Sequence, residues 1–121
     1  MTGCRKENIA PFTNKHNSPA GGESVTNPKL KDESVDLLFQ AIMSLATQEE
    51  CYQFFEDVCT VHELKALAQR LQVAKMLRDG KTYQQIEADT GASTATISRV
   101  KRYLNYGAGG YGLVLERLKK E

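Results

Sequence analysis

Residues 93–102, near the C-terminal end, combine small hydroxyl side chains with three basic ones in the order Ser-Thr-Ala-Thr-Ile-Ser-Arg-Val-Lys-Arg. Ser and Thr hydroxyls donate to or accept from any base edge, and an Ala or Thr methyl group can contact the methyl group of thymine. Arg99, Lys101 and Arg102 have no acidic residue among them, which suits contacts to phosphate oxygens or to guanine. On a helix, this combination is typical of a surface that binds the DNA major groove.

Helical spacing within this segment separates an inner face from an outer one. Ile97, Val100 and Leu104 recur at intervals of three and four residues and predict the inner face. The N-terminus of such a helix also offers free backbone N–H groups and the positive end of the helix dipole. The residues that we expect to contact DNA are Tyr83, Gln84, Ser93, Thr94, Ala95, Ser98, Lys101 and Arg102.

Two short helices with a tight turn between them would position this surface. Thr82 is a candidate N-cap for a helix over residues 83–90, and Ser93 or Thr94 can cap the helix that follows. Gly91 stands between the two helices and suits a turn that needs a positive φ angle.

The apolar residues on either side of this turn predict how the two helices meet. Ile86 and Ile97 lie eleven residues apart with Gly91 between them, which allows a steep crossing around one apolar contact. The sequence thus predicts a helix-turn-helix over about 82–106. A plain helical hairpin with a glycine turn is the alternative.

The preceding part of the chain is helical in pattern as well. Two Thr-x-x-Glu capping boxes predict helix starts at Thr47 and Thr60, and Gly80 suits a left-handed helix end. The first of the three predicted helices has the apolar stripe Val35, Leu38, Phe39, Ile42 and Leu45. The third has the stripe Leu64, Leu67, Ala68, Leu71, Ala74 and Leu77. No stretch shows the strict alternation of a strand, so we predict an all-α protein.

The two ends of the chain differ from this helical middle. Residues 1–30 are rich in Asn, Ser, Thr, Gly and Pro and are expected to form a flexible tail, whereas 31–121 are expected to form one helical domain. The glycines of residues 107–112 predict a flexible hinge before a short amphipathic helix. Its apolar residues are Leu113, Leu115 and Leu118.

Charge is unevenly distributed along the 121 residues, although the net charge is only +1. Residues 32–59 hold seven acidic and no basic residues, whereas residues 60–106 hold eight basic and four acidic ones. Such blocks matter more than their sum, because salt screens charge beyond about 8 Å. No apolar run reaches the ~20 residues of a membrane span and no export signal is visible, so we expect a cytoplasmic protein.

Neither a metal site nor an enzyme is favoured. Cys59 and His62 have the spacing C-x-x-H, but the second pair that a closed zinc site needs is missing. The histidines, His16 and His62, have no nucleophile or carboxylate at a spacing that forces them together, so we expect no catalytic site. The three cysteines are expected to be reduced thiols.

The stretch from Thr60 to Arg102 resembles the tryptophan repressor family, and in particular its repressor-like branch of uncharacterised bacterial proteins. The resemblance rests on the motif G-A-S-T-A-T-I-S-R at residues 91–99 and on A-L-x-x-R at residues 66–70 of a long helix. It implies a six-helix fold and an intertwined homodimer. Val35, Phe39, Phe54 and Phe55 are then candidate residues of the dimer core, unless they pack within one chain.

The resemblance also implies a candidate effector pocket, formed by Thr60, Arg70, Arg99 and Tyr103. Arg99 would bind the ligand carboxylate and Arg70 would stack on the indole. However, Val100 stands where the repressor has a glycine that leaves room for the indole, and Tyr103 stands where it has a serine that holds the amino group. We therefore expect weak or absent tryptophan binding. A surface ion pair is the alternative role of Arg70, and a phosphate contact that of Arg99.

The sequence as a whole predicts a dimeric, sequence-specific regulator of transcription that binds double-stranded DNA, most simply as a repressor. A helical adaptor that binds protein through the acidic block 32–59 is the alternative. Salt separates the two predictions, because binding to DNA phosphates weakens steeply as the salt concentration rises.

Overall fold

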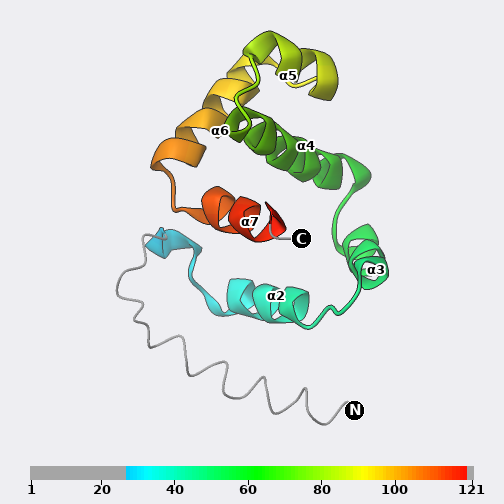
Figure 1. The fold of residues 1–121 in the computed structure, drawn as a ribbon. Helices are drawn as coiled ribbons and strands as arrows, with labels where there is room; N and C mark the ends of the chain where they lie inside the picture. Colours follow the sequence, from blue (N-terminus) through cyan, green and yellow to red (C-terminus); the bar gives the residue numbers. More distant parts are fainter. Residues whose placement is uncertain (1–26, 120–121) are drawn as a thin grey trace. The chain divides into compact units, whose positions relative to one another are not determined.

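The computed structural model describes residues 27–119, which form six α-helices, one 3-10 turn and no strand. This confirms the predicted all-α class. The elements are η1 (Pro28–Leu30), α2 (Glu33–Met43), α3 (Gln48–Val58), α4 (Val61–Arg78), α5 (Tyr83–Thr90), α6 (Thr94–Tyr106) and α7 (Gly110–Lys119) (Figure 1). The chain divides into two compact units, and the boundary between Phe55 and Glu56 falls within α3. No helix within residues 27–119 is long and apolar enough to cross a membrane.

Helix α2 of the first unit begins with an aspartate cap. A carboxylate oxygen of Asp32 accepts a hydrogen bond from the backbone N–H of Val35 at 2.8 Å, and this bond lowers the pKa of the Asp32 carboxyl. The predicted tail of residues 1–30 lies outside the described residues except for its last four, where η1 forms.

The predicted capping box at Thr47 is formed only in part. The Thr47 hydroxyl accepts the backbone N–H of Glu50 at 3.1 Å, as expected for an N-cap. The Glu50 carboxylate instead accepts the N–H of Ala46 at 2.8 Å, one residue before the cap. Both bonds still satisfy backbone N–H groups at the start of α3.

The apolar face of the first unit is largely uncovered. Neither α2 nor α3 contains a buried residue, and Phe39 and Met43, which share one face of α2, are 55% and 64% exposed. Phe54 and Phe55 are half-buried, and their rings meet edge to face with centroids 5.3 Å apart. The residues expected to form a core therefore do not form one within the first unit.

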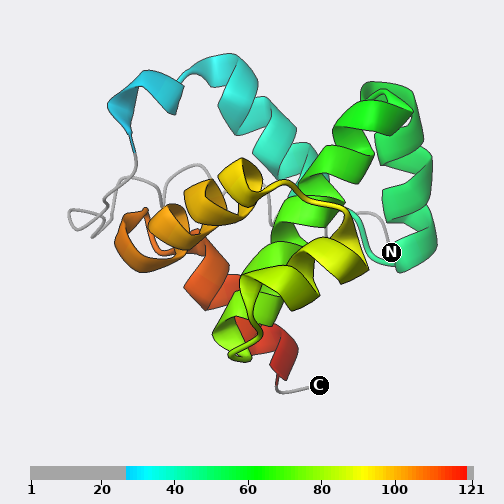
Figure 2. The same cartoon turned by 90° about the horizontal axis from the view of Figure 1, so that it is seen from above.

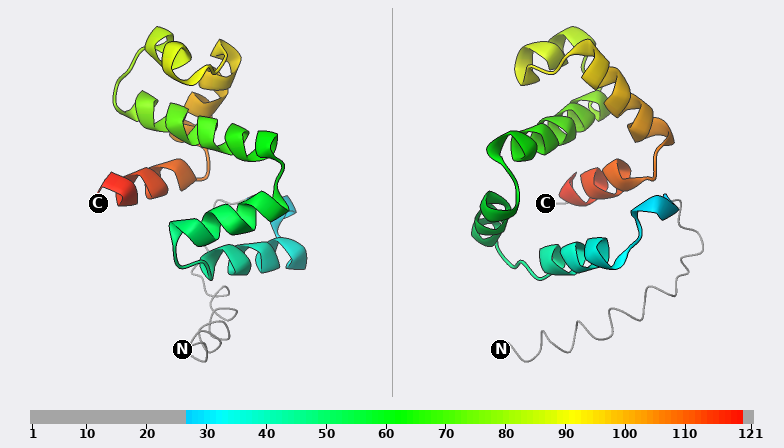
Figure 3. Two further views of the ribbon diagram at one scale, coloured as in Figure 1. Left: turned by 90° about the vertical axis from the view of Figure 1, so that its right-hand side faces the viewer. Right: turned by 180° about the vertical axis from the view of Figure 1, so that it is seen from behind.

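The second unit is built around α4. Helices α5, α6 and α7 all pack against α4, which lies between α5 and α7 in Figures 1 and 3. A capping box opens α4, because the Thr60 hydroxyl accepts the N–H of Glu63 and the Glu63 carboxylate accepts the N–H of Thr60. The helix ends before Gly80, which has φ +84°. Both ends of α4 are therefore as the sequence predicts.

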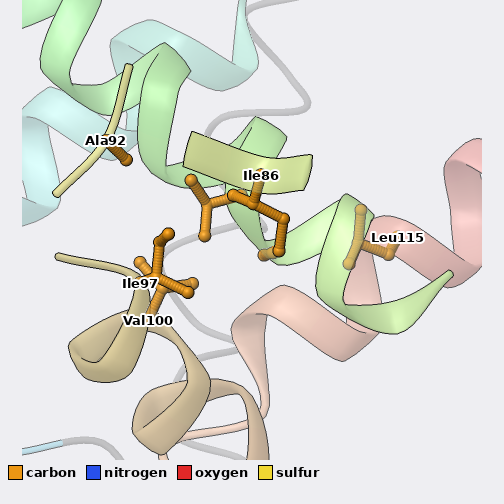
Figure 4. Close-up of a cluster of buried hydrophobic side chains, with 7 residues drawn as sticks. Ile86, Ala92, Ile97, Val100 and Leu115 are labelled. Carbon is orange, nitrogen blue, oxygen red and sulfur yellow. The ribbon is translucent and has the colours of Figure 1, made fainter. Parts of the chain in front are cut away.

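The core of the second unit brings together residues from all four of its helices. Its buried members are Val73, Ala74, Ile86, Ala92, Ile97, Val100 and Leu115. Figure 4 shows Ile86 of α5 and Ile97 and Val100 of α6 pointing toward one another. The predicted apolar contact across the turn is thus confirmed.

The predicted stripe of α4 is only partly a core face. Leu67 and Leu71 are 47% and 36% exposed, whereas Val73, which lies outside the stripe, is fully buried. The reason is that Val73, Ala74 and the neighbouring Leu77 face the other helices at the C-terminal end of α4. The face buried by α4 is therefore set by its neighbours rather than by its own periodicity.

The glycine-rich hinge is shorter than predicted, because α7 already begins at Gly110. Leu115 packs into the core of the second unit, but Leu113 and Leu118 remain about half exposed. An ion pair also joins the two helices, because the Arg78 guanidinium of α4 lies 2.7 Å from the Glu116 carboxylate of α7.

Candidate nucleic-acid interface

Helix α5 is fixed at its start by a second capping box. The Thr82 hydroxyl accepts the backbone N–H of Gln85 at 3.2 Å, and the Gln85 side-chain oxygen accepts the N–H of Thr82 at 2.8 Å. The sequence predicts Thr82 as the cap, but it does not single out Gln85. The spacing Thr-x-x-Gln could have indicated Gln85, because it is equivalent to the two Thr-x-x-Glu capping boxes predicted earlier in the chain.

The turn between α5 and α6 is held by a small hydrogen-bond network. The Thr90 hydroxyl donates to the carbonyl of Ile86 at 2.7 Å and accepts the N–H of Ala92 at 3.1 Å. From α4, the side-chain amide of Gln69 donates to the carbonyl of Thr90 at 3.1 Å. Gly91 has φ +75°, as the sequence predicts. This network fixes the angle at which α6 leaves the turn (Figure 2).

Replacement of Gly91 by alanine tests the turn. We expect Gly91→Ala to lower the free energy of unfolding by about 1 kcal/mol, because a side chain disfavours a positive φ angle. A Cβ atom at Gly91 would meet no other atom within 4 Å, so the backbone conformation alone is tested. The measurement is urea unfolding followed by circular dichroism.

Gly112→Ala is the matched control for this turn variant. Gly112 lies within α7, has an ordinary helical φ angle, and its added Cβ would also meet open space. It should therefore raise stability by about 0.5–1 kcal/mol. Equal effects of the two variants would show that Gly91 carries no conformational constraint.

Ser93, rather than Thr94, caps α6. Its hydroxyl accepts the N–H of Thr96 at 3.1 Å and also lies 3.2 Å from the Thr96 hydroxyl, to which it donates. The Ser93 hydroxyl thus both donates and accepts a hydrogen bond within the chain. Ser93 shapes the start of α6, and Thr94 becomes the first residue of the helix.

The outer face of α6 is polar and basic. Thr94, Ala95, Ser98 and Arg102 are exposed, while Ile97 and Val100 on the opposite face are 0% and 2% exposed. One side of the helix therefore packs on the core through Ile97, Val100 and the half-buried Leu104, and the other side is free to contact a partner.

The cations of α6 are also free of carboxylates. Within residues 27–119, the ion pairs are Lys75–Asp79 and Arg78–Glu116, so that Arg99, Lys101 and Arg102 have no acidic partner there. All three are exposed. Positive charge that is not neutralised within the chain favours phosphate binding.

Tyr83 connects α5 to the outer face of α6. Its hydroxyl lies 3.4 Å from the Ser98 hydroxyl, and the Lys101 ammonium lies 6.0 Å from the centre of its ring. The structure thus brings three of the predicted DNA-binding residues together. Gln84, the next residue of α5, is exposed and makes none of these contacts.

Glu87, which the sequence does not single out, contacts one of the residues predicted to bind DNA. Its carboxylate accepts a hydrogen bond from the hydroxyl of Thr94, with 2.7 Å between Oε2 and Oγ1. The two residues belong to α5 and α6 and lie seven positions apart across the turn. Because they lie on different helices, the periodicity of one helix does not bring them together, and the contact depends on the angle of the turn.

The residues of the candidate effector pocket lie on two helices. Arg99 and Tyr103 are four residues apart on α6 and share an exposed face. Arg70 of α4 lies ten positions after Thr60, the N-cap of that helix, which is about 15 Å along a helix. The Thr60 hydroxyl is engaged in the capping box, and Val100 beside Arg99 points into the core.

Two helices at a fixed turn, with an apolar inner face and a polar, basic outer face on the second, define a helix-turn-helix protein. The Trp repressor protein family model matches residues 33–119. The chain therefore belongs to the Trp repressor family, a family of non-enzymatic transcription regulators.

Relatives and solved structures agree with this assignment. The uncharacterised Bacillus subtilis protein YerC is 59% identical over 92 residues, which cover 76% of this chain and 88% of YerC. A candidate Trp repressor from Staphylococcus aureus is 56% identical with a TM-score of 0.73, over 77% of this chain and 93% of that chain. A TrpR-like protein from Eubacterium eligens is 60% identical with a TM-score of 0.75, over 77% and 96%. The six-helix fold predicted from the resemblance is confirmed.

Proposed function

We propose that this protein is a sequence-specific, DNA-binding repressor of transcription that acts as a homodimer on chromosomal DNA in the cytoplasm. The observation that carries the proposal is the difference between the two faces of α6. Ile97 and Val100 on one face are buried, whereas the hydroxyls of Thr94 and Ser98 and the three cations belong to exposed residues. An α-helix with its side chains is about 10–12 Å across, which fits a major groove about 12 Å wide. Residues 31–121 make up the DNA-binding and dimerisation domain in this proposal.

The roles of the outer residues follow from their chemistry. Thr94, Ala95 and Ser98 lie near the start of α6 and have small side chains, which suits contacts to base edges. Arg102, at the other end of the exposed face, suits a phosphate. Tyr83 and Lys101 form a positioned pair, and Gln84 beside them extends the DNA-binding surface to α5.

A selection from random oligonucleotides tests this function. The full chain is mixed with a pool of random duplexes, and bound DNA is recovered and sequenced. We expect an enriched, roughly palindromic site, because two symmetry-related reading helices would bind two half-sites. A pool that remains random after several rounds would contradict the proposal.

The uncovered face of α2 supports the homodimer. Phe39 and Met43, four residues apart on one face of α2, are more than half exposed, and an exposed apolar surface of this kind marks an interface. A second copy of the chain is the occupant that the fold family suggests. It would also supply the second reading helix.

The oligomeric state is directly measurable. Size-exclusion chromatography with light scattering is expected to give a mass of about twice 13.5 kDa at micromolar concentration. Phe39→Glu places a charge in the proposed interface and should shift the mass toward that of the monomer, whereas Tyr106→Glu, at a position 85% exposed on α6, should not. A wild-type monomer would exclude the dimer.

We do not expect tryptophan to be the effector. Val100 fills its position with a buried β-branched side chain, and Tyr103 offers no small hydroxyl for an amino group. Isothermal titration calorimetry with tryptophan should therefore give no binding in the micromolar range. Micromolar affinity that is lost in Arg99→Ala would overturn this expectation and restore the candidate pocket of Thr60, Arg70, Arg99 and Tyr103.

A further inference from the structure

The turn between α5 and α6 places a carboxylate against the first residue of the reading helix. Thr94 Oγ1 donates its proton to Glu87 Oε2 over 2.7 Å, a length typical of a charge-assisted hydrogen bond. Both side chains belong to exposed residues on the face that we assign to DNA. The pair is therefore available to a base edge.

The direction of this bond limits what Thr94 can offer to DNA. A hydroxyl has one proton and two acceptor lone pairs, whereas a carboxylate only accepts. Because the single proton is directed at Glu87, the rest of the Thr94 hydroxyl presents lone pairs only. The carboxylate beside it adds further acceptors and no donor.

We propose that Glu87 makes Thr94 an acceptor-only reader, which selects a base carrying an amino group, adenine or cytosine, at the position that Thr94 faces. In the major groove adenine presents N6–H2 and cytosine N4–H2, while guanine presents O6 and thymine O4. A carbonyl oxygen facing these two side chains would find no donor on either of them. The inference rests on the proposed function, since it concerns the specificity of the same surface.

Ser98 provides an internal comparison on the same helix. Its hydroxyl lies 3.4 Å from the phenol of Tyr83, and either of these two groups can be the donor. Ser98 can therefore switch between donating and accepting. A strict amino preference is expected opposite Thr94 and not opposite Ser98.

Glu87 has a second expected effect, which a matched variant separates from the first. Its negative charge lies on the DNA-facing side and repels phosphates, so its removal should strengthen binding to every duplex. Asp89 is an exposed acid on the same helix and makes no hydrogen bond to Thr94. Asp89→Ala removes the same charge as Glu87→Ala but leaves Thr94 unchanged.

The experiment measures base preference rather than affinity alone. The site selected by the full chain is synthesised with each of the four bases at each position, and dissociation constants are measured by fluorescence anisotropy for wild type, Thr94→Val, Glu87→Ala and Asp89→Ala. Thr94→Val keeps the shape and loses only the hydroxyl, so it identifies the position that Thr94 reads.

At that position we expect wild type to bind amino bases about tenfold more tightly than keto bases, which is about 1.4 kcal/mol, because acceptors that are left unpaired in the interface weaken binding. Glu87→Ala should reduce this ratio severalfold, because the freed hydroxyl can donate to a carbonyl. Asp89→Ala should keep the ratio unchanged.

Three results would overturn the inference. These are a preference for guanine or thymine at the Thr94 position, equal ratios in Glu87→Ala and wild type, and a Thr94→Val variant that changes no base preference. In all three cases the wild type still binds a specific site, so the proposed function stands. A wild type that binds no duplex refutes the proposed function and this inference together.

Discussion

Ile97→Ala is expected to lower the free energy of unfolding by about 2–5 kcal/mol, the range for truncating a fully buried aliphatic side chain. Ile97 is 0% exposed and lies in the cluster that joins α4, α5 and α6. Its truncation removes buried methyl groups and leaves a cavity where α5 and α6 cross. Small domains are stable by only about 5–15 kcal/mol, so much of that stability is lost.

The measurement is urea unfolding at one fixed protein concentration, because the stability of a dimer depends on concentration. Arg102→Ala on the exposed face of the same helix is the control and should change stability by no more than about 0.5 kcal/mol. If Ile97→Ala cost less than about 1 kcal/mol, the apolar contact across the turn would not hold the helix-turn-helix together.

Arg102→Ala and Ser98→Ala are expected to weaken DNA binding in different ways. Arg102→Ala should reduce affinity for all duplexes by a similar factor, because a phosphate contact carries no sequence information. Ser98→Ala should change which base is preferred at one position, by about 1–3 kcal/mol if the hydroxyl contacts a base edge.

Dissociation constants for the selected duplex and its single-base variants distinguish the two patterns. The dependence on salt adds a second readout, since the loss of one phosphate contact reduces the slope of log K against log salt by about 1. A uniform loss of affinity from both substitutions would mean that Ser98 does not lie on the reading face.

The helix-turn-helix could be predicted because its signals are local. Thr82 and Ser93 cap helices by bonds to residues three positions on, and Gly91 marks the turn by its own conformation. Ile86 and Ile97 then have only one way to meet across so short a connection. The structure confirms each of these predictions.

Features that depend on neighbouring helices could not be predicted in the same way. Val73 is buried because α5 and α6 cover its side of α4, and the helical period of α4 contains no sign of this. The start of α7 at Gly110 contradicts the ordinary preference of glycine for a hinge. Docking of Leu115 into the core favours the helix there over its local propensity.

In the candidate site, too, the features with local signals could be predicted and those that depend on packing could not. The exposed hydroxyl and basic residues of α6 follow from helical spacing, and the sequence predicts them. The bond between Glu87 and Thr94 follows from the angle of the turn, which no residue spacing encodes. The uncovered apolar face of α2 depends on what lies beyond one chain, and the sequence predicts a dimer there only through the resemblance.

The most direct test of DNA binding measures the association constant for the selected duplex, and for a shuffled duplex of equal composition, between 50 and 200 mM salt. We predict that the selected duplex binds at least about 10³-fold more tightly. If both α6 helices of a dimer neutralise phosphates with all three cations, log K should fall with log salt at a slope of up to about −5. Equal binding of the two duplexes, or an affinity that does not change with salt, would contradict the assignment of α6 as a DNA-reading helix.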